Sequence, residues 1–267
     1  ARIDRFDPTT VVLADPDDEL ITSVGDDLFG AYVAAAPAVR RAPDVPGVTV
    51  AYTAMHGVGG ATVERAFAAA GLPAPVVVAA QHDPDGTFPT VSFPNPEEPG
   101  AMDLLLASAV EAGATVAIAN DPDADRLGAA IPQADGTWRR LGGDEIGWLF
   151  ADYILSSGDA DPDAAERLVV TTLVSSALLS RMAAAHGVEA AETYTGFKWV
   201  AHEIRERPAK RFVFGYEQAL GYLVAERPRD KDGITAAVLF AEIAAVAAQR
   251  GITLQDWLDD IATRHGR

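Results

Sequence analysis

From residue 48 onward, short apolar runs alternate along the chain with longer segments in which apolar residues recur at helical spacing. In the first half, the runs predict strands at 48–55, 75–80, 115–120 and 127–131, and the last of these is expected to pair in a hairpin near Trp138. Helices are predicted at 61–71, 101–112 and 143–156. Strands that alternate with helices indicate a mainly parallel sheet with both faces covered.

The same alternation restarts after residues 156–166, a polar segment rich in Asp that we interpret as a domain boundary. Strands are predicted at 168–174, 188–193 and 211–217, and helices at 176–187, 197–207, 234–250 and 253–264. Thr253 is the expected N-cap of the last helix. The fold class is therefore α/β, with two consecutive three-layer α/β domains whose sheets are mixed and mainly parallel, at residues 41–160 and 161–267.

Residues 1–40 do not follow this alternation. They contain an acidic loop and one amphipathic helix, and a proline-rich link follows with Pro37, Pro43 and Pro46. A helix without its own sheet is an unusual beginning for a domain. We interpret this segment as the remnant of a first domain that is missing from this sequence, together with its linker.

Composition narrows the class of protein. The chain has 267 residues, of which 49% are hydrophobic, and its formal net charge of −18 argues against binding to nucleic acid or to an anionic membrane surface. It has no cysteine, which excludes disulfides and thiol catalysis and is compatible with a cytoplasmic location. The N-terminus lacks an apolar signal core, and no uninterrupted apolar stretch is long enough to span a membrane.

The segment with the clearest chemistry is 115–131, where Asp121, Asp123 and Asp125 lie between two predicted strands and Arg126 follows them directly. Three carboxylates this close repel one another unless a cation neutralises them, and their hard oxygen atoms suit Mg²⁺ or Ca²⁺. Arg126 adds a bidentate donor suited to a phosphate. The alternatives are a solvated acidic turn and a phosphohydrolase in which Asp121 is the nucleophile. The spacing does not fit a calcium EF-hand.

Four other segments carry candidate residues that are weaker in isolation. The glycine-rich turn at 56–60 suits either an anion cradle or a simple tight turn. Thr195, Gly196 and Lys198 lie between a strand and a helix. Glu217 lies between two glycines at the end of a strand, where its carboxylate is suited to sugar hydroxyls. Lys231 precedes Asp232, which is the expected cap of the long helix.

Taken together, these segments resemble the α-D-phosphohexomutase superfamily, which includes the phosphoglucomutases and phosphomannomutases. The resemblance rests on NDPDADR, TGFK, GYEQALG and KDG in this order, supported by MHGVGG and QHDPDGTFPTVSFPNPEE, and it covers about residues 45–265. The family has four domains around a cleft. The chain resembles the second and third, so the first and fourth are expected to be its partners within the same protein.

The resemblance implies a role for each matching residue. Asp121, Asp123 and Asp125 would bind Mg²⁺, and Arg126 would lie beside the transferred phosphoryl group. Thr195, Gly196 and Lys198 would line the cleft, Glu217 would hold sugar hydroxyls, and Lys231 would be a general acid/base. Two positions depart from the family pattern: Pro122 replaces a usual Gly, and Ala219 replaces a usual Ser, which puts one sugar contact in doubt.

The implied activity is an isomerase reaction: an intramolecular phosphotransferase moves a phosphoryl group between the 1- and 6-positions of a hexose phosphate. A hexose bisphosphate would be the intermediate, and the phosphoserine donor would lie outside this chain. The main alternative from the residues is a fragment that acts only as a module for binding Mg²⁺ and sugar phosphate.

Overall fold

A computed structural model describes residues 7–23, 25–157 and 163–266, and the chain divides after Tyr32 into two compact units. The first unit holds a 3₁₀ helix, Pro8–Thr10, and the beginning of helix α1, Asp26–Ala35. None of its described residues is buried. The interpretation of residues 1–40 as the remnant of a missing domain stays a prediction. Both sheets and the helices that cover them belong to the second unit, residues 33–267.

The first sheet has the strand order β2-β1-β3-β4-β5. Its strands are β1 (Val50–Thr53), β2 (Val76–Val77), β3 (Val116–Asn120), β4 (Leu127–Pro132) and β5 (Trp138–Arg140). β1 runs parallel to β2 and β3, whereas β3, β4 and β5 form an antiparallel meander, so the predicted hairpin is confirmed. Every residue of β1 and β3 is buried, which explains why both strands are continuous apolar runs rather than alternating ones.

The second sheet has the order β7-β6-β8-β9. Its strands are β6 (Arg167–Thr172), β7 (Glu189–Thr193), β8 (Arg211–Glu217) and β9 (Gly221–Leu223). β6 is parallel to β7 and β8, and β9 is antiparallel to β8. The sequence predicts only a loop after residue 217. β9 gave no signal because its three residues are too few to show the alternation of a strand.

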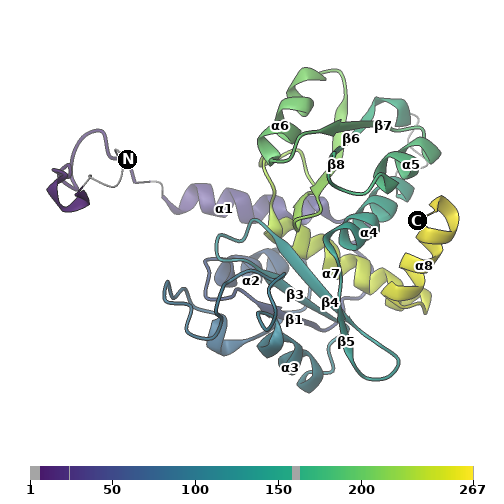
Figure 1. Cartoon of the computed structure of the whole chain (residues 1–267), viewed down its shortest axis with the longest axis horizontal. Coiled ribbons are helices and arrows are strands. Elements are labelled where there is room, and N and C mark those ends of the chain that lie inside the picture. Colours follow the sequence, from purple (N-terminus) through teal and green to yellow (C-terminus); the bar gives the residue numbers. More distant parts are fainter. Residues whose placement is uncertain (1–6, 24, 158–162, 267) are drawn as a thin grey trace. The chain divides into compact units, whose positions relative to one another are not determined.

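Helices cover both faces of each sheet (Figure 1). They are α2 (Gly60–Ala69), α3 (Asp103–Glu111), α4 (Gly143–Ser156), α5 (Leu178–Ala185), α6 (Phe197–Glu206), α7 (Gly233–Arg250) and α8 (Leu254–His265). α3 packs against the first sheet and α6 against the second, each with its own apolar cluster. The predicted fold class, two three-layer α/β domains with mixed sheets, is confirmed.

Helix α7 joins the two halves. It contacts α2, β3 and β4 on the side of the first sheet and β9, α4 and α8 on the side of the second sheet, so one apolar cluster runs continuously through both sides. By length and composition, α7 is long and apolar enough to cross a membrane. The sequence did not predict such a segment, because polar residues interrupt the apolar run. Because 78% of it is buried inside the protein, it has the character of a core helix.

The boundary that we expected near residue 160 stays a prediction, since residues 33–267 form one compact unit and residues 158–162 lie outside the described part. α4 precedes this boundary, yet it packs against α5 and β8 of the second sheet.

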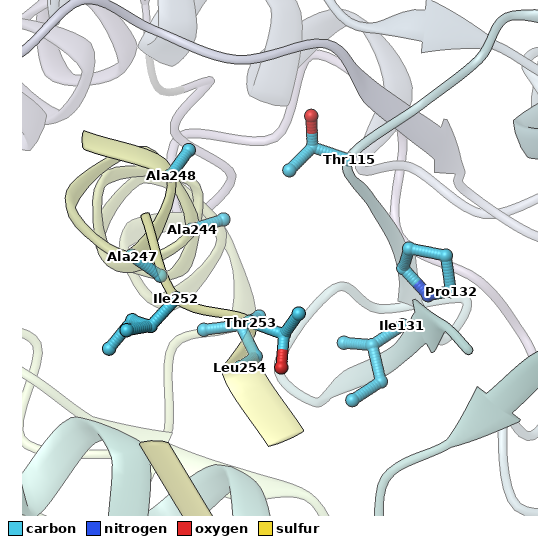
Figure 2. Close-up of a pocket in the computed structure, with 9 residues that line it drawn as sticks. All are labelled: Thr115, Ile131, Pro132, Ala244, Ala247, Ala248, Ile252, Thr253 and Leu254. Atoms are coloured by element: carbon cyan, nitrogen blue, oxygen red, sulfur yellow. The ribbon is translucent and has the colours of Figure 1, made fainter. Parts of the chain in front are cut away.

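An apolar pocket of about 130 Å³ lies where the end of β4 meets the turn after α7 (Figure 2). Ile131 and Pro132 line it from the sheet, and Ala247 and Ile252 line it from the helix and turn. No charged side chain is among the residues that line it. None of the site residues predicted from the sequence lies there.

Candidate functional site

The predicted acidic residues lie together at the carboxyl end of β3. Asp121, Asp123 and Asp125 each offer a carboxylate oxygen, and these oxygens all lie within 4.8 Å of one another. Asp121 is buried, Asp123 is exposed and Asp125 is half-buried, so the group opens from the protein interior toward solvent. The end of a strand is where open α/β sheets place ligand sites. Three hard oxygen donors at this spacing fit a divalent cation such as Mg²⁺.

Arg126 already holds the most buried of these carboxylates. Its backbone N–H donates to Asp121 Oδ1 at 3.0 Å, and its Nε donates to Asp121 Oδ2 at 2.6 Å. Burial raises the pKa of Asp121, and the charge of Asp123 adds to this, while the hydrogen bonds and the charge of Arg126 oppose it. Because Asp121 is only 1% exposed and both its oxygens accept from Arg126, its geometry argues against the alternative in which it attacks phosphorus.

A tight turn brings the three carboxylates together. Ala124, between two of them, has a φ of +58°, a left-handed conformation that is costly for a residue other than glycine. Its N–H donates to the Asp121 carbonyl at 2.9 Å, and its own carbonyl accepts from the Gly233 N–H at 3.1 Å. The first residue of α7 therefore helps to hold the turn in this conformation.

The glycine-rich turn at 56–60 packs directly against this loop. A Cβ on Gly57 would lie 2.3 Å from the Pro122 Cα, and the Val58 N–H donates to the Pro122 carbonyl at 2.8 Å. These contacts need glycine, and they use a backbone donor that an anion cradle would require. The turn at 56–60 therefore supports the acidic loop at 121–126. This favours its interpretation as a simple tight turn over that as an anion cradle.

Glu217 lies at the end of β8 and is 8% exposed. Its Oε1 accepts hydrogen bonds from Thr195 Oγ1 at 3.0 Å and from the Gly196 N–H at 2.6 Å. Gly196 has a φ of +108°, a conformation that favours glycine and that lets its N–H reach the carboxylate. Among the described residues Oε2 has no recorded partner, so one oxygen is held and the other remains to accept from a ligand.

One pocket of about 310 Å³ unites the two loops. Its lining comes from both halves of the protein: Asp121, Asp123, Asp125, Arg126, Glu217, Ala219 and Lys231. Backbone contacts fix the halves at this point, because the Leu127 N–H donates to the Leu220 carbonyl at 3.0 Å and Arg126 forms a β-bridge with Gly221. The structure thus places seven of the ten predicted residues around one space.

Lys231 faces the acidic residues across this pocket, with Nζ 2.6 Å from Asp125 Oδ2. Burial opposes the charged form of Lys231, but the hydrogen bond and charge of Asp125 outweigh it, so the pKa of Lys231 lies above its usual value. The ammonium group is therefore protonated at neutral pH.

The other three predicted residues do not line the pocket. Thr195 and Gly196 act on it indirectly, through their hydrogen bonds to Glu217. Lys198 is exposed, and its Nζ lies 5.9 Å from the centre of the Trp199 ring. The roles of all the predicted residues stay predictions, since geometry alone does not test them.

Sequence patterns did not identify the buried polar residues that contact the acidic loop at 121–126. Asn120, which directly precedes Asp121, is fully buried and bonds both Tyr52 and the Arg126 carbonyl. An asparagine at the end of an otherwise apolar strand was the available signal, because a buried amide needs partners.

Comparison with known proteins extends the picture. Residues 30–136 match the family described as phosphoglucomutase/phosphomannomutase, alpha/beta/alpha domain II, and residues 142–265 match domain III of the same family. A "Probable phosphomannomutase" of Haemophilus influenzae is 40% identical over 244 residues, which cover 91% of this chain and 48% of that protein. A human phosphopentomutase is 38% identical over 82% of this chain and 37% of that protein.

Solved structures agree in fold. A phosphoglucomutase/phosphomannomutase family protein from Burkholderia thailandensis superimposes with a TM-score of 0.66 and 24% identity, over 87% of this chain and 46% of that one. The chain thus spans less than half the length of these relatives. By its two consecutive domain matches, the chain belongs to the α-D-phosphohexomutase superfamily, of which it contains the second and third domains.

Proposed function

We propose that this chain is the central part of a phosphosugar mutase, which moves a phosphoryl group between the 1- and 6-positions of a hexose phosphate. The donor would be a phosphoserine that a part of the protein outside this sequence contributes. The observation that carries the proposal is the single pocket in which the acidic triad, Arg126 and Lys231 face Glu217. Phosphoryl transfer needs charge neutralisation and positioning above all, and this pocket offers both.

The donor set fits Mg²⁺. Asp121, Asp123 and Asp125 supply only oxygen atoms, and phosphate oxygens commonly complete the shell of this ion. When bound, the ion would neutralise the charge that builds up on the transferred phosphoryl group. Arg126 would bind the same phosphoryl group, because Asp121 fixes its guanidinium through Nε.

Two other residues have roles consistent with their surroundings. Glu217 would orient the sugar by accepting hydrogen bonds from its hydroxyls at Oε2, since Thr195 and Gly196 hold Oε1. Lys231 is protonated, and it would return a proton to the sugar oxygen that leaves phosphorus and take it back in the reverse direction.

The chain taken alone would bind the metal and sugar phosphate without turning over, because no serine nucleophile is assigned to it. The sugar itself is part of the proposal. Relatives include proteins named phosphomannomutase, phosphopentomutase and glucose 1,6-bisphosphate synthase, so a pentose phosphate is the main competitor to a hexose phosphate.

The test is a mutase assay of the longer protein with glucose 1-phosphate, mannose 1-phosphate and ribose 1-phosphate. We expect Asp123→Ala to lower kcat on the order of 10²–10³-fold, because it removes charge neutralisation at phosphorus. Chelation of divalent ions should have a similar effect. Asp135→Ala is the matched control, since Asp135 is exposed in the turn between β4 and β5. Equal activity of Asp123→Ala and the parent protein would contradict the proposal.

A further inference from the structure

Below the metal loop lies a buried polar residue to which the proposed function gives no role. Asn120 is the last residue of β3 and its exposed fraction is 0%. Its Nδ2 donates to the Arg126 carbonyl at 2.6 Å, and its Oδ1 accepts from the Tyr52 hydroxyl at 2.9 Å. Burial raises the pKa of Tyr52, so this hydroxyl keeps its proton.

The bond to Arg126 spans the whole acidic loop, and the bond to Tyr52 ties Asn120 to β1. The loop leaves β3 at Asp121 and returns to β4 at Leu127, and Asn120 joins its first flank to its last residue, Arg126. A carbonyl can only accept, so the amide nitrogen of Asn120 must face Arg126 and its oxygen must face Tyr52. The amide therefore adds a side-chain closure to the loop, beside the β3–β4 ladder in which Asn120 pairs with Leu127, and the three carboxylates lie within this closed loop.

The beginning of α7 fits tightly over this closure. A Cβ on Gly233 would lie 2.5 Å from Asn120 Nδ2, 2.4 Å from the Arg126 carbonyl oxygen and 2.7 Å from the Ala124 carbonyl oxygen. All three distances are too short for a real contact, so glycine is required there. Asn120 thus sets both the width of the loop and the distance at which α7, with Lys231 just before it, approaches the site.

We propose that Asn120, held by Tyr52, is a positioning residue that sets the metal affinity of the acidic loop. This inference rests on the proposed function, in so far as it takes the triad to be a metal site. Asn120 touches no carboxylate oxygen in any recorded hydrogen bond and therefore does not itself bind the ion. It would act by keeping the three carboxylates at the spacing that one ion needs, because outer residues that orient ligands contribute strongly to affinity.

The experiment is a titration of the protein with Mn²⁺, in which free ion is followed by electron paramagnetic resonance. Asn120→Ala should weaken Mn²⁺ binding roughly 10–100-fold, as the loss of a supporting residue typically does. Tyr52→Phe should weaken it in the same direction but less, since the amide keeps its bond to Arg126. Because the two residues act in series, adding Tyr52→Phe to Asn120→Ala should change little further.

Tyr153→Phe is the matched control. It also removes a buried tyrosine hydroxyl, which donates to Glu242 Oε1 at 2.7 Å, but this pair lies away from the metal loop. We expect its Mn²⁺ affinity to equal that of the parent protein, even though its stability falls. Tyr52→Phe keeps the inference testable if Asn120→Ala does not fold, because it preserves the ring that fills the core.

Asp123→Asn separates the two ideas. If it abolishes Mn²⁺ binding while folded Asn120→Ala and Tyr52→Phe bind as the parent does, the role of Asn120 is wrong and the metal site stands. If Asp123→Asn itself leaves the affinity unchanged, both the metal site and the inference built on it are overturned.

Discussion

Two buried glutamates of the second half, Glu217 and Glu242, have opposite surroundings. Oε1 of Glu242 accepts from the backbone N–H groups of Arg41 and Ala42 and from the Tyr153 hydroxyl, and its Oε2 accepts from Arg40 Nε at 2.8 Å. Both oxygens are therefore engaged, and the residue is fully buried.

Glu217, in contrast, has both its recorded donors on one oxygen and lines the pocket that it shares with the acidic triad. A carboxylate with four donors has no acceptor site left for a ligand, because its two oxygens offer about four such sites, whereas one with two donors is oriented and still able to accept. Asp121, like Glu217, has only two donors. Burial alone therefore does not identify a functional carboxylate: the acceptor sites that remain open toward a pocket do.

Glu242→Gln should have the largest effect on stability. It leaves the guanidinium of Arg40, whose side chain is 5% exposed, without its charged partner in the interior. Breaking a buried pair in this way costs about 3–5 kcal/mol. Urea unfolding measures the loss, and we expect the fraction that stays folded to bind Mn²⁺ as the parent protein does. A loss below about 1 kcal/mol would show that the pair is not structural.

Gly143→Ala should have the second-largest effect on stability, because the added methyl group would clash with the loop that carries Glu217. A Cβ at this first residue of α4 would lie 1.7 Å from the Gln218 carbonyl oxygen, so the loop after β8 must move. Overpacking of this kind costs about 1–3 kcal/mol. We also expect the KM for sugar phosphate to rise, since Glu217 shifts with the loop.

The control is Gly86→Ala, where an added Cβ meets nothing within 4 Å. It should leave both the unfolding midpoint and the KM unchanged. If the two alanine variants behave alike, the close approach of α4 to the Glu217 loop does not govern the site.

Glu217→Gln should have a smaller effect on stability than the same change at Glu242. An amide oxygen still accepts from Thr195 and Gly196, and no buried cation loses its partner. The expected loss is about 1 kcal/mol, the worth of a weakened hydrogen bond, while the kcat/KM of the mutase reaction falls. Equal destabilisation at both glutamates, measured by urea unfolding, would remove the distinction between them.

Lys198→Met should have the smallest effect. Its side chain is exposed and does not line the pocket, whereas Lys231 pairs with Asp125 across it. We expect kcat/KM to change less than about 3-fold for Lys198→Met, and much more for Lys231→Met, because Lys231 lines the pocket proposed for phosphoryl transfer and Lys198 does not. A strong effect of Lys198→Met would restore the cleft-lining role that the family resemblance implies for it.

Local sequence patterns are sufficient to predict most of the helices and strands and the chemistry of the loops. Strands with both faces covered are continuous apolar runs, as in β1 and β3, and helix ends carry caps such as Asp232, so both are visible in local patterns. Asp121, Asp123 and Asp125 could be predicted as a group because residues two apart in one tight turn cannot move far from each other. Local signals of this kind need no knowledge of the rest of the chain.

The residues that meet across the pocket are brought together by long-range packing. Glu217 lies 92 or more positions from the acidic triad in the sequence, and its approach depends on the bridge between Arg126 and Gly221 and on α7, which packs against both sheets. β9 was missed for a local reason, since its three residues are too few to show a period. The approach of Glu217 and the bond between Tyr52 and Asn120 could not be predicted because they join segments that are distant along the chain, and their geometry is set by packing rather than by local backbone preference.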